Sequence, residues 1–79
     1  MNDILWDEII LDDFRHLACL TADEEKILQD WKAGDSVTKS ARKQSMSSRQ
    51  VDRLRNQIRR KYDAVQPFTP LLPKRTIKR

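Results

Sequence analysis

The chain has few of the residues that build metal sites, disulfides or catalytic pairs. Among its 79 residues, Cys19 is the only cysteine, His16 the only histidine and Gly34 the only glycine. A Cys/His metal cluster, a disulfide or a Cys/His catalytic pair therefore cannot form within one chain. A glycine-rich phosphate loop is excluded in the same way. We expect no enzymatic activity, no cofactor and no metal.

Long apolar runs are missing as well, and the N-terminus lacks the basic and then apolar pattern of an export signal. We therefore expect no membrane association and a cytoplasmic location. The length predicts one small domain, near the lower size at which a core holds without a metal or disulfides.

Charge is divided along the chain. Residues 1–37 carry three basic and ten acidic side chains, a net charge of −7, whereas residues 38–79 carry thirteen basic and two acidic ones, a net charge of +11. Uneven charge is common in small soluble domains. A concentrated basic block is also the electrostatic footprint of nucleic-acid binders, and this is the interpretation we favour.

The acidic half predicts a helical segment over residues 3–19. Its apolar residues lie near helical spacing: Trp6, Ile9, Ile10, Phe14 and Leu17. A break near residues 10–12 is the alternative, with Asp12 capping a second helical piece. The segment either completes the core, which we favour, or forms a dimer contact. Cys19 is expected to be a small buried side chain.

Capping patterns predict two further helices. Thr21 and Glu24 form a capping box at the start of a helix of about 22–33, and Gly34 stands where a left-handed C-terminal cap is needed. Ile27, Leu28 and Trp31 give this helix its buried face, and its acids are expected on a solvated face. Either Asp35 or Ser36 caps a short helix of about 37–44, in which the small Ala41 allows close packing.

Residues 48–65 predict the longest helix, apolar on one side and basic on the other. Ser47 and Gln50 have the spacing of a capping box, and Met46 and Val51 that of a hydrophobic staple. The expected buried stripe consists of Val51, Leu54, Ile58, Tyr62 and Val65. The opposite pole consists of Arg49, Arg53, Asn56 and Arg60. Such a helix suits DNA recognition.

Prolines at 67, 70 and 73 end the last helix, so the domain is expected over residues 1–65 and an extended basic tail over 66–79. Two interpretations of this tail stay open. Its basic residues form a mobile arm on DNA, namely Lys74, Arg75, Lys78 and Arg79. Alternatively, Phe68, Leu71 and Leu72 fold back onto the domain.

The chain resembles the helix-turn-helix shared by LuxR/GerE-type regulators and sigma-70 region 4, over residues 20 to about 65. The resemblance is carried by Leu20, Thr21, Glu24, Ile27, Leu28, Gly34, Ser36, Ala41, Met46, Ser47 and Val51. It departs at Ser40 and Gln44, where these families have aliphatic residues, and at Leu54, where LuxR-type proteins have histidine. Pro67 also leaves no room for the dimerisation helix of GerE-type domains. The expected fold is thus an all-α bundle that contains a tri-helical helix-turn-helix.

The resemblance implies that the helix of residues 48–65 lies in the major groove of DNA. The expected base-contacting residues are Arg49, Asp52, Arg53 and Asn56. An arginine can donate two hydrogen bonds to guanine, and an asparagine can pair twice with adenine. Asp52 either accepts from cytosine or, as we favour, pairs with Arg49, Arg55 or Lys39.

Other basic residues are expected to hold the protein on the DNA backbone. The expected phosphate contacts are Lys39, Arg42, Lys43, Ser47, Ser48, Arg60 and Lys61. Arg55 and Arg59, at the flank of the helix, could bridge to the acidic half instead.

The sequence thus predicts a sequence-specific protein that binds double-stranded DNA, as a small transcriptional regulator of bacteria or their mobile elements. One alternative is an adaptor similar to sigma region 4 that contacts RNA polymerase or another regulator. Further alternatives are a DNA-packaging or mobile-element end-recognition module and a purely structural helical protein. Homodimerisation stays open.

Overall fold

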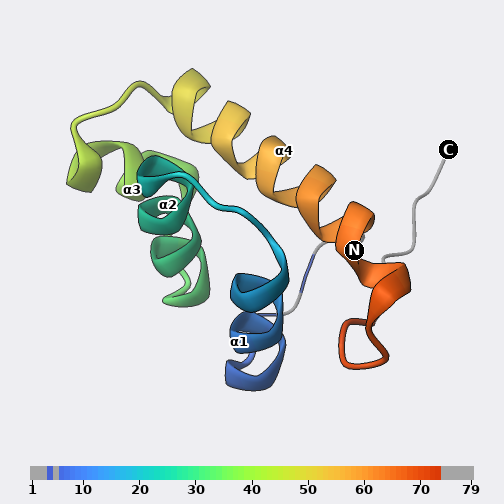
Figure 1. Cartoon of the computed structure of the whole chain (residues 1–79). Coiled ribbons are helices and arrows are strands. Elements are labelled where there is room, and N and C mark those ends of the chain that lie inside the picture. The colour runs from blue at the N-terminus through green and yellow to red at the C-terminus, as the bar shows by residue number, and fades with distance from the viewer. Residues whose placement is uncertain (1–3, 5, 74–79) are drawn as a thin grey trace, which may run out of the picture.

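Four α-helices joined by short connections make up most of the computed structural model, which describes residue 4 and residues 6–73 (Figure 1). They are α1 (Glu8–Leu17), α2 (Ala22–Lys32), α3 (Val37–Gln44) and α4 (Ser48–Val65), followed by a single 3-10 turn, η1 (Gln66–Phe68). No strand occurs among the described residues. The all-helical fold is confirmed, and α2, α3 and α4 lie within one residue of their predicted ranges.

Each α-helix begins at a side chain that accepts a hydrogen bond from a backbone N–H of its first turn. The four N-cap residues are Asp7, Thr21, Ser36 and Ser47. Thr21 and Glu24 form the predicted capping box. Gly34 has the left-handed φ of +89° that was predicted after α2.

The N-terminal segment differs from its prediction in three ways. First, its helix among the described residues is Glu8–Leu17, shorter than the predicted segment of residues 3–19, because Asp7 caps it; it is continuous, without the alternative break near residues 10–12. Second, only Ile10, Leu11 and Phe14 of α1 are buried, whereas Ile9 and Leu17 are exposed. Third, Cys19 is exposed rather than buried, because it lies in the connection after α1.

Helix α4 is the centre of the packing, since it contacts α1, α2, α3 and η1. Val51, Leu54, Ile58 and Tyr62 of the predicted stripe are buried, and Val65 is half-buried. Trp6 joins the elements through ring contacts, with centroids 5.2 Å from Phe14, 5.7 Å from Trp31 and 5.9 Å from Tyr62. The N-terminal segment therefore completes the core.

Within the described residues, the segment after α4 is folded and not extended. After η1 it turns back, so that Leu72 is buried and the Tyr62 hydroxyl donates to the carbonyl of Pro73. Thr69 Oγ1 also donates to Asp13 Oδ2 of α1, at 2.7 Å. Leu72 thus folds back, whereas Phe68 and Leu71 are exposed.

The expected tail contacts Lys74, Arg75, Lys78 and Arg79 lie outside the described residues. Within the described part, no helix is long and apolar enough to cross a bilayer. The same part holds no group of three or more metal-ligating side chains.

Candidate functional site

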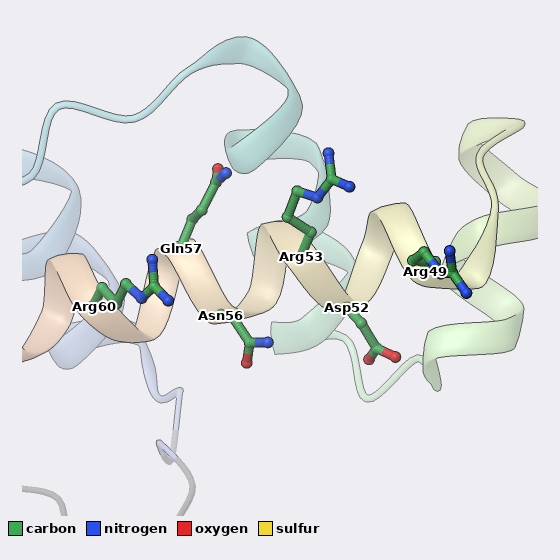
Figure 2. A pocket seen from close by; sticks show the side chains of 6 residues that line it. All are labelled: Arg49, Asp52, Arg53, Asn56, Gln57 and Arg60. Carbon is green, nitrogen blue, oxygen red and sulfur yellow. The ribbon is translucent and has the colours of Figure 1, made fainter.

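The exposed face of α4 carries an open hollow of about 430 Å³. It is lined by Arg49, Asp52, Arg53, Asn56, Gln57 and Arg60, which all belong to this one helix (Figure 2). Four of them are the predicted base-contacting residues, so the structure brings these four together. Gln57 was missed, although it follows Arg53 by four residues, the spacing that places two side chains on the same side of a helix.

The arginines of this face are exposed, and none of them has an acidic partner within the part of the chain that the structure describes. No carboxylate of the described residues lies within ion-pair distance of Arg49, Arg53 or Arg60. Asp52 shares the face, but among the described residues no ion pair joins it to Arg49, Arg55 or Lys39, the residues expected to hold it. The favoured interpretation of Asp52 as a partner for these cations is therefore not supported.

Lys39 and Lys43 of α3 point to acidic residues of α2 and of the turn that follows it. Lys43 Nζ lies 3.0 Å from Asp30 Oδ1 and 2.9 Å from Asp35 Oδ2, and Lys39 Nζ lies 3.4 Å from Asp35 Oδ1. The hydrogen bond to Asp35, followed by that to Asp30, raises the pKa of Lys43. The bond from Lys43 likewise lowers the pKa of Asp35. Lys43 is thus engaged within the protein, which is against its predicted role as a phosphate contact.

A buried polar cluster around Asp30 explains two departures from the family pattern. Ser40 Oγ and Gln44 Nε2 donate to Asp30 Oδ2 at 2.7 and 2.9 Å, and Ser40 is fully buried. Burial raises the pKa of Asp30, but hydrogen bonds from Ser40, Gln44 and Lys43 outweigh it, so the pKa lies below its ordinary value. Polar residues at 40 and 44 therefore serve the buried carboxylate that joins α2 to α3.

A second buried acid holds Lys61. Glu24 is only 2% exposed, and Lys61 Nζ lies 2.5 Å both from its Oε1 and from the carbonyl oxygen of Cys19. Burial raises the pKa of Glu24, but hydrogen bonds from Lys61 and Thr21 outweigh it and lower the pKa overall. The prediction of Lys61 as a phosphate contact is not supported, because its ammonium group is directed into the protein. The prediction that the acids of α2 lie on a solvated face is wrong for Glu24 and Asp30, which are buried. Asp35, which follows α2, is buried as well.

The flank of α4 is tied to α2 through Trp31. The guanidinium carbons of Arg55 and Arg59 each lie 4.8 Å from the centroid of the Trp31 ring. Arg55 is buried and donates to the carbonyl oxygen of Asp35 at 2.7 Å, so it bridges to the acidic half. Arg59 Nη1 donates to Asn56 Oδ1 at 2.8 Å and thereby reaches the exposed face.

The remaining candidates for phosphate contacts are Lys39, Arg42, Ser47, Ser48 and Arg60, all of which are exposed. Ser47 also caps α4 by accepting from the N–H of Gln50 at 3.1 Å. They lie at the ends of α3 and α4 and along the exposed face of α4. Comparison of the chain with protein-family models, with curated proteins and with solved structures found no match.

Proposed function

We propose that this protein binds double-stranded DNA sequence-specifically, as a small transcriptional regulator of bacteria or their mobile elements. In this proposal α4 enters the major groove, with Arg49, Arg53 and Asn56 as the base-reading residues. The observation that carries it is the exposed face of α4, where three arginines, without an acidic partner among the described residues, lie beside amide side chains. Arginine and asparagine are the side chains best suited to reading purine edges.

The length of this face fits the proposal. Arg49 and Arg60 are separated by eleven residues, which at 1.5 Å per residue span about 16 Å along the helix axis. The major groove is about 12 Å wide and admits an α-helix. The reading residues at the N-terminal end of α4 would then face base edges while Arg60 reaches the backbone.

The junction between α3 and α4 supports a helix-turn-helix arrangement of α2, α3 and α4. Three residues join the two helices, and Ser45 turns the chain with a φ of 54°. Met46 N donates to Ala41 O at 2.9 Å, and Ala41 is buried where α3 meets the core. A short turn between packed helices is typical of DNA-binding helix-turn-helix motifs, in which the second helix reads the groove.

The disposition of the acids also favours a polyanion as ligand. Asp30 and Glu24 are buried and engaged by Lys43 and Lys61, so their charge is compensated inside the protein. The exposed arginines of α4 therefore dominate the field over the proposed reading face. Such a field accelerates association with DNA and makes affinity depend on salt.

Selection of bound duplexes from a random pool, followed by affinity measurements over a salt series, tests this function. We expect one preferred site, and an affinity that falls steeply with salt. Arg53→Ala should relax the preference at one or two base pairs, at a cost of about 1–3 kcal/mol. Lys26→Ala is the matched control, because it removes one positive charge from an exposed residue of α2. Equal binding of every duplex by the wild type would contradict sequence-specific recognition.

The alternative of an adaptor for RNA polymerase or another regulator is favoured by one observation. Ile9 and Leu17 are 67% and 43% exposed on the acidic helix α1, and exposed apolar residues can contact a protein. Retention of purified RNA polymerase without DNA, and its loss in Ile9→Lys, would support the adaptor.

A further inference from the structure

The side chain of Asn56 is oriented by a neighbour on its own helix. Arg59 Nη1 lies 2.8 Å from Asn56 Oδ1. A guanidinium group has only donors, so the amide must turn its oxygen, and not its nitrogen, toward Arg59. In Figure 2 the amide nitrogen of Asn56 points toward Asp52, and its oxygen points away from the helix.

Arg59 is itself held against the core. Its guanidinium carbon lies 4.8 Å from the centroid of the Trp31 ring, within the range of a cation–π contact. Trp31 is fixed in turn, because Trp6 packs edge-on against it at 5.7 Å and Arg55 also lies over its ring. A residue of α2 thus sets the position of Arg59 and, through it, the orientation of the Asn56 amide.

This orientation bears on the base that Asn56 can read. Pairing with adenine requires the amide oxygen to accept from adenine N6 while the nitrogen donates to N7. Guanine presents two acceptors, N7 and O6, and needs donors only. Arg59 occupies one lone pair of Oδ1 and places a positive charge beside it, which disfavours the approach of a second donor such as adenine N6, whereas the two N–H groups of Nδ2 face no such competition.

We infer that Arg59 is a positioning residue that makes Asn56 a donor to guanine rather than a bidentate partner of adenine. The inference rests on the proposed function and replaces the adenine pairing expected from the sequence. It assigns Arg59 a role in specificity although Arg59 is not among the residues that line the hollow.

Selection from a random duplex pool with four proteins tests the inference: the wild type, Asn56→Ala, Arg59→Ala and Arg60→Ala. The base pair at which Asn56→Ala loses its preference identifies the position that Asn56 reads. We expect guanine there for the wild type, with a preference over adenine of about tenfold or more. Arg59→Ala should abolish or reverse that preference, because the freed oxygen can then accept from adenine.

Arg60→Ala is the matched control. It removes the same charge from the next residue of α4, whereas the hydrogen bond to Asn56 comes from Arg59, so it should lower the affinity and leave the base identity unchanged. Adenine at this position in the wild type, or an unchanged guanine preference in Arg59→Ala, would overturn the inference.

A measurement on the protein without DNA tests the contact between Arg59 and Asn56 separately from the proposed DNA binding. In a 15N–1H correlation spectrum, the side-chain amide signals of Asn56 should shift clearly more in Arg59→Ala, which loses the hydrogen bond to Oδ1, than in Arg60→Ala. No difference between the two variants would overturn the positioning contact whatever the protein binds. A shift as expected, in a wild type that selects no duplex, would instead contradict the proposed function and the base preference that depends on it.

Discussion

Replacement of Asp30 by alanine should strongly destabilise the protein, because the residue is only 4% exposed and its carboxylate accepts hydrogen bonds from three side chains of α3, those of Ser40, Gln44 and Lys43. The fully buried hydroxyl of Ser40 would lose its acceptor, at a cost of about 1–3 kcal/mol, and half-buried Gln44 would add about 1 kcal/mol. Lys43 would keep Asp35 as a partner. We therefore expect a loss of about 2–4 kcal/mol in the free energy of unfolding.

The size of the effect is large for a chain of 79 residues. Domains of this length unfold with about 4–12 kcal/mol, and 1 kcal/mol corresponds to about 4–8 °C in melting temperature. Urea unfolding followed by circular dichroism would measure the change. Asp23→Ala is the control, because this acid of α2 is exposed and should contribute less than about 1 kcal/mol through the helix dipole.

A double variant and a pH series test the explanation itself. In the Asp30→Ala background, Ser40→Ala removes the orphaned hydroxyl and should recover about 1 kcal/mol, so that the two effects are not additive.

The pKa of Asp30 is lowered from 3.8, so its stabilisation is present above pH 3.8 and is lost as the pH falls through the folded value. The difference between wild type and Asp30→Ala should therefore persist from pH 5 to 8 and shrink below about pH 3.8. A loss below 1 kcal/mol for Asp30→Ala, or strict additivity with Ser40→Ala, would refute the reasoning.

Three further changes have defined outcomes. Lys61→Met should lower the free energy of unfolding by about 2 kcal/mol, because the buried carboxylate of Glu24 loses a charged donor. Chemical denaturation measures this loss, and an unchanged free energy of unfolding would contradict the contact between Lys61 and Glu24. Gly34→Ala should lower the free energy of unfolding by about 1 kcal/mol. The cost comes from the φ of +89° alone, since an added Cβ would meet no atom within 4 Å. A thermal melt measures the change, and an unchanged melting temperature would contradict the left-handed cap. The raised pKa of Lys43 means that its stabilisation is complete below pH 10.5 and is lost as the pH rises through the folded value, so wild type and Lys43→Met should converge in stability above that pH.

Much of the helical architecture was predictable because its determinants are local. Caps at Thr21 and Ser47, the left-handed residue Gly34 and the apolar period of α4 act over a few residues, and each helix of the predicted trio begins where its cap stands. The grouping of Arg49, Arg53 and Asn56 on one face follows from the same period.

The errors concern side chains whose surroundings come from distant parts of the chain. Periodicity alone places Ile9 as readily inside as Ile10, and only the packing of α1 against α4 decides that Ile10 is buried. A count of charges places Lys61 among the phosphate contacts, whereas Glu24, 37 residues away, engages it. No local pattern reports such a pair.

The sequence by itself determined three things: that the chain is all-helical, at which residues α2, α3 and α4 begin, and which face of α4 is basic. Caps and helical periodicity suffice for these because they depend on neighbours within one or two turns. The tertiary structure decided which cations are left for a ligand. Lys43 and Lys61 meet buried carboxylates across helices, Arg55 meets a backbone carbonyl, and Arg59 meets Trp31. These partners are set by the packing of α2 against α3 and α4, which brings together charges that are far apart in the chain and leaves the exposed arginines of α4 to act on what lies outside.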